Sequence, residues 1–449
     1  IINKSGLGLA AAAIARRKLS MNISKGLAAL AAVAACLAWT WPAMAAGGQG
    51  RVDELERRME ILAEELRNLK EAQVIPETQE LKSSWGLGPA ASKVYGVDRG
   101  MSIGGYGEVN YANIISDKGS GNDSADFVRM VLYFGYKFSD RILFNSEIEF
   151  EHASTGKSGS VSVEFAALDF LFDERLNARA GLLLMPVGFM NELHEPPFYH
   201  GNMRPQVEQQ IIPSTWRANG AGIFGNLGPS LSYRSYLVTS LDAKGFSDGN
   251  LRGGRQKGSK ERAQDFSWVG RLDYSPRPGL LLGASAYLGD QGQGQLFDTD
   301  GDGSADAEVD AFMQMYELHG EWKYRGLELR ALGTLVDLDD ADALGNDIGK
   351  TIAERMEGYY AEVAYDVMPL LNAGSSQYLA PWLRYSSIDT QAKVPAGFTA
   401  NEDKDRRIIE VGLSYKPIPT VVLKLDYRNQ DSAGADAADE LRLGAGFAF

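Results

Sequence analysis

Four aspartates fall within nine residues of the segment DTDGDGSADAE, which begins at Asp298. Asp298, Asp300 and Asp302 alternate along the chain, and Asp306 stands at the ninth position, as in calcium-binding loops of the D-x-D-x-D-G type. The twelfth position holds Val309 in place of the glutamate that closes such loops. We therefore expect a weak structural Ca²⁺ site formed by these four aspartates, and an acidic surface loop without metal is the alternative.

A second group of ionisable side chains lies in residues 185–216, a segment too long for a tight turn. Its candidates for selecting a solute by charge are Glu192, His194, Glu195, His200, Arg204 and Glu208. Two histidines and a glutamate in this group also suggest zinc, but their spacing across two adjacent prolines is not a known ligand pattern. We expect a constriction loop here rather than a metal site.

Nucleophilic catalysis has little support in this sequence. The chain contains 4 histidines and shows no recognisable arrangement of serine, histidine and aspartate. We therefore expect a protein that is not an enzyme, with a hydrolase as a weaker alternative.

The elements that must position these residues are strands, because from residue 101 onward the apolar side chains recur at every second position. In the run RIIEVGLSYKP, Ile409 and Val411 share one face, while Glu410 and Ser414 share the other. The last nine residues, LRLGAGFAF, repeat this alternation up to Phe449. One face of each strand is apolar and the opposite face is charged.

Short turns alternate with long polar connections between these strands, and about sixteen strands fit between residues 101 and 449. An even strand number with alternating loop lengths is typical of a closed antiparallel transmembrane β-barrel. A soluble β-sandwich also alternates, but it explains neither the loop asymmetry nor a charged interior. We predict an all-β barrel in the outer membrane of a Gram-negative bacterium.

The charged face of the strands would line the lumen of such a barrel. Our pore-lining candidates are Arg129, Arg179, Arg217, Arg234, Arg271, Arg330, Lys323, Glu147, Glu149 and Glu317. The same face also carries Glu108, Glu321, Glu328, Glu362, Glu410, Asp426, Lys424 and Arg428. A mixed lumen of this kind selects solutes by rings of charge, or its charges pair across strands and only stiffen the wall.

The N-terminal residues carry different signals. Residues 21–45 match a secretory signal peptide that ends in Ala43-Met44-Ala45, and residues 1–20 are expected to be an upstream non-native extension. The single cysteine, Cys36, leaves lipoprotein processing as an alternative. Residues 51–73 alternate apolar spacings of three and four, which predicts a helical coiled coil, and residues 74–100 are expected to be a linker.

Composition excludes one class of partner. The chain has 45 Lys+Arg against 59 Asp+Glu, a formal net charge of −14, whereas nucleic-acid-binding proteins concentrate basic charge. The expected partners are therefore outer-membrane lipid, small hydrophilic solutes and, through the coiled coil, further copies of the same chain in a homotrimer.

The run RAGLLLMPVGFMNELHEPPFYHGNMRPQVEQQIIPSTWRANGAGIFG resembles the phosphate-selective porin O/P-like family. The coiled coil is similar to that of trimeric porins for small dicarboxylates. These resemblances imply a sixteen-stranded trimer whose third loop folds inward. They imply a water-filled channel for passive diffusion of small, charged solutes. Because the lumen charges are mixed, phosphate specificity is not carried over, and a structural or adhesive barrel with a plugged lumen is the alternative.

Overall fold

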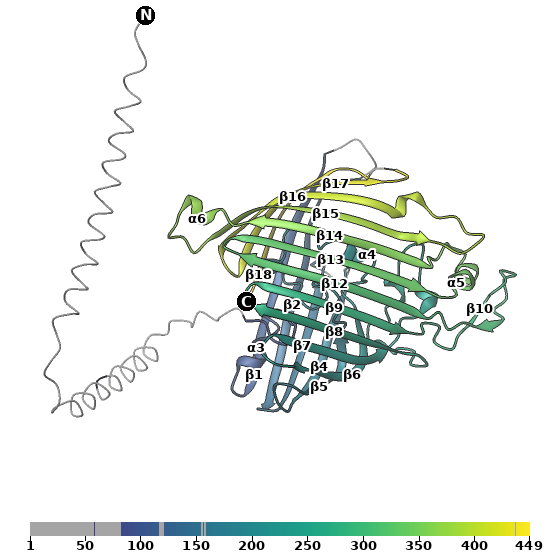
Figure 1. Cartoon of the computed structure of the whole chain (residues 1–449), viewed down its shortest axis with the longest axis horizontal. Coiled ribbons are helices and arrows are strands. Elements are labelled where there is room, and N and C mark those ends of the chain that lie inside the picture. The colour runs from purple at the N-terminus through teal and green to yellow at the C-terminus, as the bar shows by residue number, and fades with distance from the viewer. Residues whose placement is uncertain (1–57, 59–81, 116–120, 154–155, 157–158, 436) are drawn as a thin grey trace, which may run out of the picture. The chain divides into compact units, whose positions relative to one another are not determined.

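The computed structural model describes Arg58 and residues 82–115, 121–153, 156, 159–435 and 437–449 (Figure 1). The expected extension 1–20, signal peptide 21–45 and nearly all of the coiled coil 51–73 lie outside the described residues and remain predictions. No helix in the described part of the chain is long and apolar enough to cross a membrane.

Sixteen strands close into one antiparallel barrel, which confirms the predicted fold class. β10 (Leu296–Phe297) and β11 (Ala307–Glu308) form a separate two-stranded ribbon. The barrel strands are β1 (Gly100–Ile114), β2 (Ser124–Ser139), β3 (Ile142–Glu151), β4 (Val161–Leu171), β5 (Asn177–Leu184), β6 (Arg217–Asn226), β7 (Leu231–Thr239), β8 (Phe266–Arg277), β9 (Leu280–Gly289), β12 (Met313–Tyr324), β13 (Leu327–Leu338), β14 (Arg355–Tyr365), β15 (Tyr378–Lys393), β16 (Asp405–Ile418), β17 (Val421–Ser432) and β18 (Glu440–Ala448).

The C-terminal strand closes the barrel. β18 pairs with β1 in a register that places Tyr106 opposite Ala448 and Ile114 opposite Glu440. Beyond the strand, Gly105 and Phe449 exchange two backbone N–H···O hydrogen bonds of 2.9 Å. Each of the sixteen described strands therefore pairs on both sides, and the wall they form has no open edge.

The outer and inner faces of the wall differ as the alternation requires. On β16 and β18, Ile409 is 44% exposed and Leu443 50% exposed, whereas Glu410 is 1% exposed inside. Tyr274 and Tyr324 lie on the outer face just before short turns, at a depth where rings suit the lipid–water interface. The exterior is therefore built for lipid and the interior for charge.

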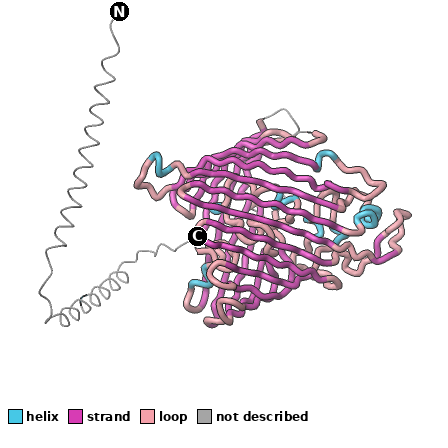
Figure 2. Tube along the Cα trace, viewed as in Figure 1, coloured by secondary structure: helices cyan, strands magenta, loops and turns pink. Residues whose placement is uncertain are grey.

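Helices are short and confined to the connections, as Figure 2 shows. α3 and α6 lie at the end of the barrel with the short turns, and α5 and β10 lie at the opposite end with the long loops (Figure 1). The helical turns are α3 (Lys93–Gly96), η1 (Pro196–Phe198), α4 (Val207–Gln210), η2 (Ala243–Gly245), η3 (Arg252–Gly254), α5 (Ala341–Ile348), α6 (Met368–Leu371) and η4 (Glu402–Lys404).

Candidate functional site

The constriction loop, residues 185–216, folds into the lumen between β5 and β6, and nearly all of its residues are buried. A fully buried amide holds its two ends together. Asn191 Nδ2 donates to the carbonyl oxygens of Met185 at 2.7 Å and Trp216 at 2.8 Å, and its Oδ1 accepts from the Trp216 N–H at 2.6 Å. This clamp lets a 32-residue excursion leave and rejoin adjacent strands.

The loop reaches strands on every side of the lumen. From one end to the other it contacts β8, β3, β1, β16, β17 and β14. The contacts are Arg271 with the Gly188 carbonyl, His194 Nε2 with Glu147 at 3.1 Å, Tyr199 Oη with Glu108 at 2.9 Å, His200 Nδ1 with Ser414 at 3.0 Å, Asn202 N with Asp426 at 2.7 Å, and Tyr360 Oη with Glu208 at 2.8 Å. The loop therefore spans the cross-section of the barrel.

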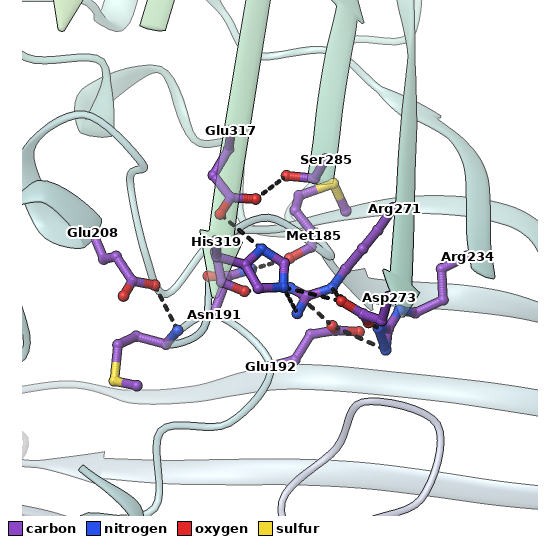
Figure 3. Close-up of polar contacts among 12 residues, drawn as sticks. Met185, Asn191, Glu192, Glu208, Arg234, Arg271, Asp273, Ser285, Glu317 and His319 are labelled. Atoms are coloured by element: carbon purple, nitrogen blue, oxygen red, sulfur yellow. Dashed lines mark hydrogen bonds and ion pairs between the residues drawn. The ribbon is translucent and has the colours of Figure 1, made fainter. Parts of the chain in front are cut away.

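A network of charged side chains joins the constriction loop to β8 and β12 (Figure 3). Arg271 Nε donates to both carboxylate oxygens of Asp273 at 3.0 and 2.9 Å. His319 lies between Asp273, at 3.0 Å, and Glu317, at 2.8 Å. Each of these side chains is buried, so the network holds its charges in pairs away from solvent.

A second anchor lies on β14, β15 and β16. Arg384 is 0% exposed, donates to Glu362 at 2.6 and 2.8 Å and donates to Glu410 at 3.0 Å. Its Nη2 also donates to the carbonyl oxygen of His200 in the constriction loop at 2.7 Å. One guanidinium thus joins three strands to the loop.

All ten pore-lining candidates make hydrogen bonds or ion pairs within the wall or to the constriction loop. Arg129 pairs with Glu108 and Glu149, Arg179 with Asp169, Arg217 with Glu164, Arg234 with Asp273 and Glu192, Arg330 and Lys323 with Glu321, Glu147 with His194, and Glu317 with His319 and Ser285. Sequence reasoning omitted Arg384, Asp169, Asp273 and Glu164, although Asp273 and Arg384 share the inward parity of their strands. Their position on the inward face of the strand alternation is the sequence signal that identifies Asp273 and Arg384.

Arg204 differs from the carboxylates of the constriction loop. It is 5% exposed, and its Nη1 donates to Thr215 Oγ1 at 3.2 Å. Its Nε and Nη2 have no hydrogen-bond partner among the residues that the structure describes. By contrast, the carboxylates of Glu192, Glu195 and Glu208 all have partners. Arg204 therefore has three N–H groups, on two buried nitrogens, that no described residue accepts.

The histidines of the constriction loop do not assemble a metal site. His194 contacts β3 and His200 contacts β16, so the zinc arrangement considered from the sequence is not formed by these two residues. His200 does lie between Ser414 and Glu328, but its Nε2 is 3.9 Å from the Glu328 oxygen, beyond a hydrogen bond. Ser414 is 1% exposed.

The aspartate-rich segment lies in the long connection between β9 and β12. Carboxylate oxygens of Asp298, Asp300 and Asp302 lie within 4.8 Å of one another. Asp306 instead accepts from the Thr299 backbone N–H and hydroxyl, each at 3.0 Å, and these bonds lower the pKa of its carboxyl. The structure thus brings together three of the four predicted calcium ligands.

Comparisons with known proteins agree with the architecture. No family model matches the chain. A relative in Aquifex aeolicus (strain VF5), described only as an uncharacterized protein, is 36% identical over 383 residues, which cover 81% of this chain and 83% of the relative. The chain belongs to the same family as this protein.

Three solved structures share the fold, each with a TM-score of 0.50. A loop-deletion mutant of the Vibrio cholerae outer membrane protein OmpT is 11% identical and covers 79% of this chain and 100% of its own. The outer membrane channel DcaP of Acinetobacter baumannii is 14% identical and covers 78% and 97%. Salmonella typhi OmpF, in complex with daunomycin, is 12% identical and covers 78% and 98%.

The closed wall and its apolar exterior place this protein in the outer membrane of a Gram-negative bacterium. The outward side chains of the strands are mostly apolar, and the backbone groups of neighbouring strands hydrogen-bond to each other instead of to water.

Proposed function

We propose that this protein is a porin that lets small, charged, hydrophilic solutes diffuse passively across the outer membrane. The observation that carries the proposal is the constriction loop, which crosses a charged sixteen-stranded lumen and contacts strands on all sides. Barrels of this size enclose an aqueous path, and a loop folded into the lumen sets its width and charge. The function is therefore selection by size and charge without chemistry on the solute.

The test of this function is electrical. Purified full chain in a planar lipid bilayer should pass current in discrete steps. We further propose a homotrimer, for which closure in three equal steps is the expected record; single-step closure would contradict it. Folded barrels that remain silent would contradict the porin function and favour a structural or adhesive barrel.

Arg204→Glu should shift the channel toward cations. The unused donors of Arg204 place positive potential at the constriction, and the glutamate reverses its sign. The reversal potential in a KCl gradient should move toward the potassium equilibrium value. Arg407→Glu is the matched control, because Arg407 carries the same charge on the outer face, where its side chain is 62% exposed. An equal shift in both variants would refute a role for Arg204.

We also propose that Asp298, Asp300 and Asp302 bind Ca²⁺ weakly, with Asp306 as the weakest of the four predicted ligands because it lies outside the group of carboxylate oxygens within 4.8 Å of one another. Calcium takes oxygen ligands, and a loop without its closing glutamate is expected to bind at about the millimolar level. Calorimetry should show binding that Asp302→Ala abolishes. Asp403→Ala, in another external connection, should leave the titration unchanged. Equal heats for all three proteins would mean a plain acidic loop.

A further inference from the structure

Residues 84–97, here called the inner segment, do not behave as the linker expected for 74–100. They precede β1 and pack against the lumen face of the wall. Ala90 and Ala91 are each 3% exposed and Val94 is 1% exposed. Small apolar residues buried to this degree inside a charged lumen need a surface that fits them.

Five consecutive strands hold the inner segment. Its contacts follow the wall in order from β2 to β6. They are Lys137 Nζ with the Val97 carbonyl at 2.8 Å, Asn145 Nδ2 with the Ala91 carbonyl at 2.8 Å, Tyr95 Oη with Asp169 at 2.6 Å, Arg179 Nη2 with Tyr95 Oη at 2.9 Å, and Trp85 with Phe224 at 5.1 Å between ring centroids. The segment therefore crosses a large arc of the lumen.

The wall is shaped to receive this segment. A Cβ on Gly104 of β1 would lie 2.5 Å from the Ala90 carbonyl oxygen, and one on Gly135 of β2 would lie 2.7 Å from Val94. The space left between the segment and β3–β5 is about 10 Å³, which does not exceed what one water molecule needs. Glycines at the points of closest approach and a sealed joint indicate a docked element.

The inner segment is also tied to the constriction loop. The N–H groups of Ala90 and Ala91 donate to Glu195 Oε1 at 3.0 and 3.3 Å. Glu195 is 0% exposed, so these are buried bonds whose loss leaves a polar group unsatisfied. A Cβ on Gly88 would lie 2.2 Å from Glu195 Oε1. A side chain at residue 88 would therefore have to displace the Glu195 carboxylate from its present position.

We propose that the inner segment is a plug that narrows the lumen from the side of β2–β6, and that its docking on Glu195 keeps the constriction loop in its narrow arrangement. This inference rests on the proposed porin function, since a plug matters only where solutes pass. Displacing the segment removes its bulk from the lumen and frees Glu195 from its backbone donors. Both effects widen the path for ions.

Gly88→Val tests the plug, with Gly96→Val as its matched control. The valine at 88 collides with Glu195, whereas a Cβ on Gly96 meets no atom within 4 Å. In planar bilayers, the unitary conductance of the full-length Gly88→Val protein should rise by about two-fold or more, and Gly96→Val should match the parent chain. Displacement is followed separately by maleimide labelling of Ala91→Cys in a Cys36→Ser background, slow in the parent and fast with Gly88→Val.

The outcomes separate this inference from the porin function. If the parent conducts and Gly88→Val shows the same conductance, the plug is refuted and the channel stands. If folded parent and variants are all silent, both fail. Should Gly88→Val not reach the folded form on an unheated gel, Glu195→Ala replaces it with the same expected rise, because it removes the acceptor without adding bulk. An unchanged conductance in that variant also refutes the plug.

Discussion

Arg384→Ala is expected to destabilise the barrel by about 3–5 kcal/mol, because it leaves buried carboxylates without their counter-charge. Glu362 and Glu410 are 6% and 1% exposed and flank the guanidinium from neighbouring strands. The change also removes the bond to the His200 carbonyl, which loosens the constriction loop. Urea unfolding followed by the gel mobility of folded and unfolded barrels measures the loss.

Two further variants serve as controls for the Arg384→Ala measurement. Arg355→Ala removes an ion pair with Asp337 whose side chains are 45% and 31% exposed, so its effect on the free energy of unfolding should be far smaller than that of Arg384→Ala. Adding Glu362→Gln and Glu410→Gln to Arg384→Ala should recover much of the lost stability, because the uncompensated charges disappear. If Arg384→Ala lowers the free energy of unfolding no more than Arg355→Ala does, the buried ion pairs of Arg384 do not stabilise the barrel.

Asn191→Ala is expected to have the second largest effect, a local destabilisation of about 2–4 kcal/mol at the base of the constriction loop. The change removes three hydrogen bonds of 2.6–2.8 Å and leaves the buried Trp216 N–H without its acceptor. Opening at this point releases residues 185–216 without touching a wall strand. Limited proteolysis should cut the loop faster, and channel records should become noisier with higher mean conductance.

The matched control is Asn113→Ala. Asn113 Nδ2 also donates one short bond, to Asp123 at 2.8 Å, but it does so at the exposed end of β1. Its loss should change unfolding by less than about 0.5 kcal/mol and leave proteolysis within the constriction loop unchanged. Equal loop cleavage in the parent and Asn191→Ala proteins would show that the clamp does not hold the loop.

The strands and their two faces were predictable from the sequence alone. Ile409 and Glu410 sit on opposite sides of β16 because side chains alternate along an extended backbone, and lipid accepts only one of the two. The count of sixteen strands follows from that alternation together with the loop lengths. These signals depend only on residues close together in the chain, so they can be recognised in the sequence.

The partners of each lumen charge depended on the tertiary structure. Arg384 meets Glu362 and Glu410 because the registers of β14, β15 and β16 align them. Asn202 in the constriction loop bonds Asp426, 224 residues away. No spacing within one strand encodes such a pair, because the partner lies on another strand or in the folded loop.

The inner segment is the clearest example of packing that the sequence alone does not predict. Its proline and glycines are typical of a linker, because those residues interrupt helices and strands. In the structure, Gly88 instead makes room for Glu195, and Gly135 on β2 makes room for Val94. A glycine that admits a neighbour and a glycine in a free linker look alike in a sequence. Only the closed barrel, which brings residues 84–97 against five strands at once, distinguishes a packed segment from a connection.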